Sequence, residues 1–338
     1  MTGEIAKPAD LLGAEDAGND WKLAPRSHAE KLRPEAAALR RVLEHSAIQE
    51  IMSRYRRADQ LASNYQDSYK KLGRAEIYLA TAAAVLGAIV LTMTDTSGAT
   101  ESLESVRPAL LVLQVLCAGG VAAIKYYASV NKPFIGWQKQ RSIAETARIE
   151  LFETVAGMTE RTWENEVREN DYPLLPLQLE YFVRYQLGVQ LKYYEGRGAQ
   201  HAAAAKRFVG VGAAITFVAT VAGAIVAAGS GIGDTLSVAA VAALLTPILL
   251  TAQTGLSRLN QDERNAARYE ITLGHLRKRS ADLSDVRRLA LDGNTDAVHE
   301  FIRRNGEVLS VEHSEWIAQQ ADAGQPDGNA EDANNGNA

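Results

Sequence analysis

The sequence has very few of the residues that hold disulfide-bonded or metal-binding domains together. It has one cysteine, Cys117, so a disulfide framework is excluded, and no Cys/His spacing typical of zinc is present. The six histidines are scattered, and we expect them to be exposed polar positions on helices rather than metal ligands. They are His28, His45, His201, His275, His299 and His313. The net charge of −5 argues against nucleic-acid binding.

The sequence also lacks a catalytic constellation. Gly229-Ser-Gly231-Ile-Gly233 superficially resembles a phosphate-binding loop, but it has neither the lysine nor the strand and helix that such a loop needs. We interpret this segment as an external turn, and we predict no enzymatic activity, no catalytic residue, no metal and no cofactor. Residues 1–20 are polar without an apolar core, so we expect no cleavable signal peptide.

Charge is missing from four long apolar stretches, and this is the strongest signal in the chain. The stretches contain no Asp, Glu, Lys or Arg, and each is about as long as a helix needs to cross the hydrocarbon core of a bilayer. They are Ile77–Thr94, Ala109–Ile124, Phe208–Gly229 and Leu236–Leu256. We predict an all-α, polytopic membrane protein with two transmembrane helical hairpins, four spans in all, and long cytoplasmic amphipathic helices.

The charges between the stretches predict the orientation. There are 13 Lys and Arg residues before the first span, 12 in Lys125–Arg207 and ten after Leu256, whereas the turns Asp95–Pro108 and Ser230–Thr235 hold one base together. Cytoplasmic segments are enriched in Lys and Arg. We therefore expect a multi-pass protein of the bacterial inner membrane with both termini in the cytoplasm.

The order of basic helix, span, turn, span and charged helix occurs twice. Arg54-Tyr55 precedes the first pair of spans and Arg184-Tyr185 the second, and Ala147–Glu150 is matched by Ala267–Glu270. Both copies have the same orientation, which predicts a parallel repeat. The expected regions are a disordered tail at 1–30, a first helix, hairpin and charged helix at 31–170, a second two-span repeat at 171–282, short cytoplasmic helices at 283–320 and a disordered tail at 321–338.

Helix-breaking residues give the boundaries between these regions. We predict a break at Asn131-Lys132-Pro133, a charged helix from about Ile135 to Arg168, and a boundary between the copies at Asn170–Pro173. A short helix at Asp296–Arg304 is expected, with Thr295 and Gly306 as its start and stop signals.

The helix after the second span carries a recognisable motif. A tryptophan is followed by an arginine four residues later, then by Ala-Glu and by Arg-x-Glu, and the residues are Trp137, Arg141, Ala144-Glu145, Arg148 and Glu150. This pattern, with Arg54-Tyr55 ahead of the first hairpin, resembles the SLATT family of two-span effector domains. The resemblance covers Arg54–Phe152 well and Tyr181–Arg279 weakly, as an apparent tandem copy. It implies a membrane effector of a bacterial conflict or antiphage defence system, associated with nucleotide-making or nucleotide-sensing proteins.

The charged residues of that motif allow two interpretations. Arg141, Glu145, Arg148 and Glu150 are spaced for salt bridges along one helix or between subunits. Alternatively, the arginines form a site for nucleotide phosphate, since arginine suits bidentate phosphate contact. Because acids alternate with the bases, we favour the self-paired face.

Inside the spans, two places weaken the helix. Gly119-Gly120 in the second span and Thr246-Pro247 in the fourth lie near matching depth. They are our candidates for a hinge or gate, and close packing with an ordinary proline kink is the alternative. Polar side chains that could face a pore are Gln114, Thr246, Gln253 and Thr254, and the small residues Gly210, Ala214, Ala219 and Gly223 would let helices approach closely.

These features predict a membrane effector that forms a homo-oligomer and acts as a regulated pore or disrupts the bilayer. Four uncharged spans enclose little water, so several subunits are needed for a conducting path. The alternative is a non-catalytic membrane scaffold that docks a cytoplasmic partner. Besides the lipid bilayer, we expect a nucleotide-sensing or nucleotide-synthesising partner and no nucleic acid.

Overall fold

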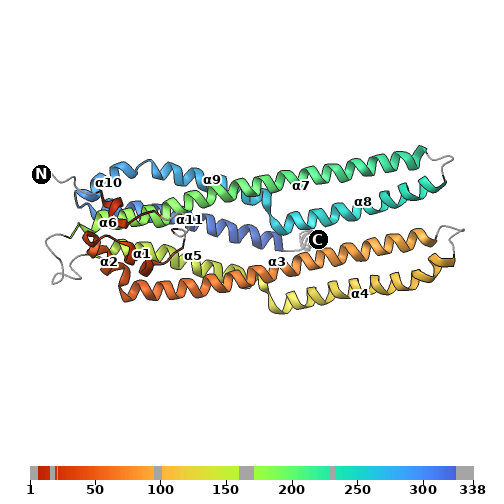
Figure 1. Cartoon of the computed structure of the whole chain (residues 1–338), viewed down its shortest axis with the longest axis horizontal. Coiled ribbons are helices and arrows are strands. Elements are labelled where there is room, and N and C mark those ends of the chain that lie inside the picture. Colours follow the sequence, from red (N-terminus) through yellow and green to blue (C-terminus); the bar gives the residue numbers. More distant parts are fainter. Residues whose placement is uncertain are drawn as a thin grey trace, which may run out of the picture. The chain divides into compact units, whose positions relative to one another are not determined.

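Within the residues that the structure describes, every regular element is a helix (Figure 1). The computed structural model describes residues 7–15, 20, 22–94, 101–159, 171–228 and 233–324. The predicted all-α class is therefore confirmed. The elements are η1 (Pro8–Leu12), α1 (Pro25–Lys31), η2 (Pro34–Ala36), α2 (Ala37–Glu44), α3 (Ser46–Thr94), α4 (Glu101–Asn131), α5 (Pro133–Gly157), α6 (Leu174–Phe182), η4 (Val183–Leu187), α7 (Gly188–Ala228), α8 (Gly233–Asn260), α9 (Asp262–Ser280), α10 (Leu283–Leu291) and α11 (Thr295–Gly324).

The chain divides into two compact units, and long helices run from one into the other. Unit 1 consists of Met1–Ala62, Gln138–Gly196 and Arg268–Ala338, and unit 2 consists of Ser63–Trp137 and Arg197–Ala267. Unit 2 thus holds all four predicted spans with the ends of the flanking helices, and unit 1 holds most of the segments predicted to be cytoplasmic.

Unit 1 is organised around α6, a short helix that is buried on nearly all sides. Tyr181 and Leu177 on α6 are completely buried, together with Phe152 of α5 and Leu39 of α2. Each such side chain contributes on the order of 2 kcal/mol by leaving water. The buried polar groups on α6 are satisfied: Glu180 accepts two hydrogen bonds from Arg287, at 2.6 and 2.8 Å, which ties α6 to α10.

The N-terminal segment is part of this core, whereas the sequence predicted a disordered tail at 1–30. Residues 8–12 and 25–31 are helical, and Leu11, Leu12 and Ala29 are buried. Arg184 holds the segment by donating hydrogen bonds to the Gly13 carbonyl oxygen at 2.8 Å and the Ala14 carbonyl oxygen at 2.6 Å. Because the stretch is polar overall, the sequence analysis did not recognise Leu11 and Leu12 as core residues.

The C-terminal helices also differ from the prediction of short helices. Helix α11 begins at Thr295 as expected but continues through Gly306. A Cβ atom at Gly306 would lie 3.3 Å from the Ile149 side chain of α5, so this glycine serves close packing rather than helix termination. Conversely, α5 ends at Gly157, before the predicted Arg168, and residues 160–170 lie outside the described part of the chain.

In unit 2, α3 packs antiparallel to α4, and α7 packs against α8. Gly87 and Leu79 of α3 meet Gln114 and Gly120 of α4, and Gly212 of α7 meets Gln253 of α8. A further contact joins the two pairs, because Gly73 of α3 lies against Leu259 of α8 and Ile77 lies against Gly255. Small residues at these positions allow the helices to approach closely.

Three stretches of the described helices are long and apolar enough to cross a membrane: Ser46–Leu91, Ser105–Gly157 and Leu174–Ala222. These stretches contain the predicted span Ile77–Thr94 as far as Leu91 and all of Ala109–Ile124. They also contain the part of Phe208–Gly229 that ends at Ala222. The fourth predicted span, Leu236–Leu256, lies in α8, where side chains are described only from residue 244 onward. Four spans arranged as two membrane hairpins therefore remain a prediction.

The two predicted copies share one backbone feature that the sequence did not reveal. Lys132, between α4 and α5, has φ +45°, and Gln261, between α8 and α9, has φ +54°. Both residues keep helical hydrogen bonds on either side. The backbone N–H of Lys132 or Gln261 donates to the carbonyl oxygen four residues earlier, and its carbonyl oxygen accepts from the N–H four residues later. The break at Lys132 confirms the predicted one, and Gln261 makes a break of the same geometry, while the repeated hairpin stays a prediction.

Candidate functional site

Helix α5 begins with an aromatic cluster that contains the motif tryptophan. Trp137 stacks on Tyr69 of α3 with ring centroids 5.9 Å apart, and Phe134 meets both rings at 5.1 and 6.1 Å. Tyr65 lies one turn before Tyr69 on α3, and its ring would lie 2.7 Å from a Cβ atom at Gly136 of α5. These contacts bring the start of α5 against α3, which gives Trp137 a packing role in unit 2.

Further along α5, in unit 1, Glu145 lies between the two motif arginines. It pairs with Arg141, which also lies 3.6 Å from Asp59 of α3, and it lies 3.9 Å from Arg148. The Arg148 Nε donates to the Gln186 Oε1 at 2.8 Å. Gln190 is also placed to accept from Arg148 when its amide oxygen faces the guanidinium group.

The last motif residue, Glu150, accepts a hydrogen bond from Arg54 of α3 at 2.7 Å. Both side chains are partly exposed, so this ion pair adds little stability. Thus each arginine of the motif is engaged by carboxylate or amide oxygens from α3, α5, η4 or α7. The arrangement supports the self-paired interpretation, because a phosphate would have to displace these partners.

The two arginine–tyrosine landmarks lie in different environments. Arg184 and Tyr185 lie on the π-helical turn η4, and Tyr185 is buried and stacks on His28 with centroids 3.8 Å apart. Tyr55 is only partly buried against the same core. A π-turn is an uncommon element that is frequent at functional sites, and here it directs Arg184 toward the N-terminal segment.

The second copy of the Ala-Arg-x-Glu motif is also placed differently from the first. Arg268 is buried and lies over the Tyr269 ring at 5.4 Å, beside Tyr193 and Tyr194 of α7. Arg148 follows the break at Lys132 by sixteen residues, whereas Arg268 follows the break at Gln261 by seven. The two motifs therefore lie at different levels along their helices.

The candidate hinge residues of the second span differ from each other. A Cβ atom at Gly120 would lie 3.0 Å from the Leu79 side chain of α3, whereas a Cβ atom at Gly119 would meet nothing within 4 Å. Gly120 lies twelve residues before the break at Lys132, and Pro247 lies fourteen residues before the break at Gln261. The two weak points are thus at similar distances from equivalent breaks.

Helix α8 continues through its proline. Pro247 lies inside the helix, and the Thr251 hydroxyl donates to its carbonyl oxygen at 2.7 Å. The Thr246 side chain is half-buried. The Thr254 hydroxyl donates to the Leu250 carbonyl oxygen at 2.8 Å, so it bonds within its own helix.

The candidate glutamines lie between paired helices. Gln114 packs against Gly87, where a Cβ atom would lie 2.8 Å from the glutamine amide nitrogen. The Gln253 amide donates to the Phe208 carbonyl oxygen and packs against Gly212. These contacts give each glutamine a partner on the neighbouring helix of its own pair, as expected for polar groups in an apolar surrounding.

One histidine forms a site that the sequence analysis missed. His28 was expected to be exposed, but it is 3% exposed, with its Nδ1 3.0 Å from the Tyr181 hydroxyl and its Nε2 3.1 Å from the Lys22 carbonyl oxygen. Burial lowers the pKa of His28 to about 4, so the imidazole is neutral near pH 7. His201 and His299 also have partners, the Asp262 carboxylate and the Ala156 carbonyl oxygen.

Two open surface grooves lie on the described part of unit 1. The larger, ≈ 670 Å³, lies between α3 and α5 and is lined by Arg54, Arg57, Glu50 and Glu150 among others. The smaller, ≈ 510 Å³, lies between α5 and α11 beside His299. Among the described residues, no group of three His, Cys, Asp or Glu side chains is placed to hold a metal ion.

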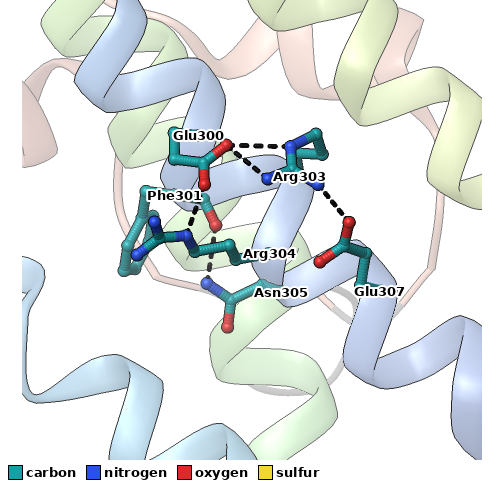
Figure 2. Close-up of polar contacts among 6 residues, drawn as sticks. All are labelled: Glu300, Phe301, Arg303, Arg304, Asn305 and Glu307. Carbon is teal, nitrogen blue, oxygen red and sulfur yellow. Dashed lines mark hydrogen bonds and ion pairs between the residues drawn. The ribbon is translucent and has the colours of Figure 1, made fainter.

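The exposed side of α11 beside the smaller groove carries an ion-pair ladder within one helix (Figure 2). Glu300 accepts hydrogen bonds from Arg303 at 2.6 and 2.8 Å and from Arg304 at 2.5 Å, and Arg303 also pairs with Glu307. The hydrogen bonds from the two arginines lower the pKa of Glu300. Such a ladder is typical of a solvated helix surface rather than of a catalytic site.

Comparison with known proteins identifies the second half of the chain. Residues 182–316, from the end of α6 into α11, match the family model described as SMODS and SLOG-associating 2TM effector domain 1. The match falls where the sequence showed the weaker resemblance, and it includes α10 and α11 beyond the predicted repeat. The tandem copy thus stays a prediction. Neither a curated protein nor a solved structure matches the chain. The resemblance predicted from the sequence is confirmed over residues 182–316, which match the model of a SLATT domain.

Proposed function

We propose that this chain is a membrane effector that oligomerises and forms a regulated pore or disrupts the bilayer. The family match supports a membrane effector of a defence system. The observation that carries the pore proposal is the outer surface of unit 2, where large apolar side chains are exposed without compensating charge. On α4, Val115 is 69% exposed and Leu116 is 66% exposed, and on α7, Phe217 is 69% exposed.

Part of that surface is suited to a second subunit rather than to lipid alone. Gly210 and Ala214 are exposed on α7, one turn apart, and a Cβ atom at Gly210 would meet nothing within 4 Å. A small-xxx-small pattern lets another helix approach closely in a membrane. One chain encloses little water between its paired helices, so the conducting path in this proposal lies between subunits.

The gate in this proposal is the pair of weak points in α4 and α8. Bending at Gly120 and Pro247 would move the cytoplasmic ends of both helices together, since the two residues lie at similar distances from equivalent breaks. Thr246, Thr254 and the glutamines would line the path only if bending or assembly turned them away from their present partners.

The chain itself offers a matched test of the gate. Gly120→Leu places a side chain against Leu79, whereas Gly119→Leu places the same side chain in open space. We expect ion flux into liposomes to fall at least tenfold for Gly120→Leu and to change less than twofold for Gly119→Leu. Pro247→Ala should also reduce flux, because it restores a backbone hydrogen bond in α8. Equal flux for all variants would assign these residues to packing, and no leakage from the wild-type protein under any trigger would reject the pore.

Oligomerisation and topology can be tested separately from flux. We expect Gly210→Leu to lower the oligomer fraction in detergent, measured by mass photometry, and a monodisperse wild-type monomer would reject assembly. For topology, a cysteine at Ser97 or Gly231 should react with an impermeant thiol reagent in intact cells, and one at Ser284 should not. The first two positions lie outside the described residues.

The second candidate function is a non-conducting scaffold, and the folded cytoplasmic unit favours it. Its two grooves offer places for a partner, which in the family context would be a nucleotide-sensing or nucleotide-synthesising protein. This function predicts that such a partner co-purifies with the chain and that membranes stay intact when both are expressed together.

A further inference from the structure

One stripe of α3 carries two positive charges toward the neighbouring pair of helices in unit 2. Lys70, Gly73, Arg74 and Ile77 follow one another at the three- and four-residue spacings of a single helix face. Gly73 lies against Leu259 of α8 and Ile77 lies against Gly255. The stripe therefore faces the cytoplasmic end of α8, and Lys70 lies one turn before the contact begins.

Positive charge exceeds negative charge at this point. Lys70 is half-buried, and burial together with the nearby charges of Arg74 and Arg197 lowers its pKa. Within the described part of the chain, neither Lys70 nor Arg74 forms an ion pair. Against these three basic groups, two acids act on Lys70, namely Asp67 of α3 and Asp262 of α9, and Asp262 also lies 2.7 Å from the His201 ring. A half-buried ammonium group among like charges is stabilised by an anion from outside.

The surroundings place this charge at headgroup level. Lys70 lies seven residues, or about 10 Å along a helix, before the apolar stretch that begins at Ile77. Tyr69 is its neighbour and forms the cluster with Phe134 and Trp137. Aromatic side chains are enriched at both membrane–water interfaces, where lipid phosphate groups also lie.

We propose that Lys70 and Arg74, with Arg197 from α7, bind the phosphate group of an anionic phospholipid at the cytoplasmic end of unit 2. The acyl chains of the lipid would lie along the exposed apolar surface of the helices, while its headgroup bridges the cationic stripe of α3 and Arg197 of α7. The inference rests on the membrane placement of unit 2 from the proposed function, and it does not require a pore.

Lys71 provides a matched control for this site. It has the same charge at the same depth and is exposed, as Arg74 also is, but it lies about 100° around the helix from Lys70 and nearly opposite Gly73. We would purify wild-type protein, Lys70→Gln/Arg74→Gln and Lys71→Gln in a neutral detergent, and titrate each with phosphatidylglycerol or phosphatidylcholine. Native mass spectrometry would count bound lipid, and thermal unfolding would report stabilisation.

We expect phosphatidylglycerol to bind the wild-type protein and Lys71→Gln alike, and phosphatidylcholine to bind weakly. Each positive charge that contacts the headgroup should strengthen binding roughly fivefold, so the double variant should lose about 25-fold, whereas Lys71 lies on the other side of the helix and should contribute little. Inorganic phosphate in place of lipid should compete only weakly, and full competition would assign the site to a free anion. Equal phosphatidylglycerol binding by the double variant and Lys71→Gln would overturn the proposal.

The same measurement separates this inference from the pore. Lipid binding in detergent is independent of conduction, so selective loss in the double variant would support the site even if the wild-type protein carries no flux. Conversely, flux that persists without lipid selectivity would retain the pore and reject the lipid site.

Discussion

The two units of this chain distribute their apolar side chains in opposite ways. Among the described residues, nearly all of the buried hydrophobic side chains belong to unit 1, and unit 2 contributes Val90 and Ala222. Most of the large exposed hydrophobic side chains belong to unit 2, including Val209 of α7 and Tyr126 of α4. A soluble unit of the same size would bury these groups, so the difference indicates that unit 2 is not covered by water alone.

The polar groups of the two units complete this comparison. Unit 1 satisfies buried charge with defined partners, as Glu180 does with Arg287 and Arg184 does with Asp20 at 2.8 Å. The apolar stretches of unit 2 have no charge to satisfy, and several of their described polar side chains bond to backbone on the same or the neighbouring helix, as Gln253 and Thr254 do. Unit 1 resembles a water-soluble domain, and unit 2 follows the rules of a bilayer.

A charge introduced on the outer surface of each unit tests this comparison most strongly. Leu116→Arg in unit 2 and Leu291→Arg in unit 1 replace leucines that are 66% and 61% exposed. In a bilayer, the first substitution should cost about 3 kcal/mol, whereas the second, in water, should change stability by less than about 0.5 kcal/mol. We expect Leu116→Arg to lose most of its carbonate-resistant membrane fraction. Equal behaviour of the two variants would mean that unit 2 is also covered by water or protein.

Truncation of an aromatic side chain should instead have a larger effect in unit 1 than in unit 2. Phe152→Ala removes a ring from the core of unit 1, where it is 2% exposed, and Phe217→Ala removes one that is 69% exposed in unit 2. We expect Phe152→Ala to destabilise unit 1 by about 3–5 kcal/mol and to lower its thermal midpoint accordingly. Phe217→Ala should leave that midpoint unchanged. A large drop in the thermal midpoint for Phe217→Ala would mean that this ring lies in a contact between subunits.

The spans and the helical class could be read from the sequence because both depend on local composition. Four uncharged stretches are visible without any neighbour, and Asn131-Lys132-Pro133 marks a break for local steric reasons. The roles of Gly306 and Leu11 depend instead on contacts far along the chain, with Ile149 in the first case and with the core of unit 1 in the second. Local patterns could not distinguish a packing glycine from a stop signal.

The candidate site shows the same limit. The motif on α5 was visible, but its partners Gln186 and Gln190 come from η4 and α7 about forty residues away. His28 was missed because a lone histidine in a polar segment carries no signal of burial, and its partner Tyr181 lies 153 residues away. Arg148 and Arg268 lie at different distances from the breaks at Lys132 and Gln261, and this difference could be recognised only once the structure had located both breaks.

His28 gives unit 1 a pH dependence that unit 2 should not share. Its pKa of about 4 in the folded protein is below the ordinary value of 6.5, so between these values the unfolded chain binds more protons. Stability should be complete above about pH 6.5 and should fall, by as much as roughly 3 kcal/mol, as the pH drops toward 4. We expect His28→Gln to flatten the curve of thermal midpoint against pH from 7 to 4.5. An unchanged slope in that variant would assign the acid sensitivity to other groups.

The smallest effect should come from the ion-pair ladder on the exposed side of α11. Glu300 bonds to Arg303 and Arg304, but all three side chains are partly or largely exposed, so water competes for each contact and salt screens the charges. We expect Glu300→Gln to leave the thermal midpoint of unit 1 within experimental error, both at low salt and at 0.5 M salt.

Glu180→Gln is the matched comparison, because that carboxylate is 5% exposed and bonds to Arg287. It should lower the midpoint clearly and independently of salt, since loss of a partner leaves a charge poorly satisfied at the edge of the core. If Glu300→Gln were the more damaging of the two, the exposed side of α11 would have to be covered by another surface, and the description of unit 1 as a water-covered domain would fail there.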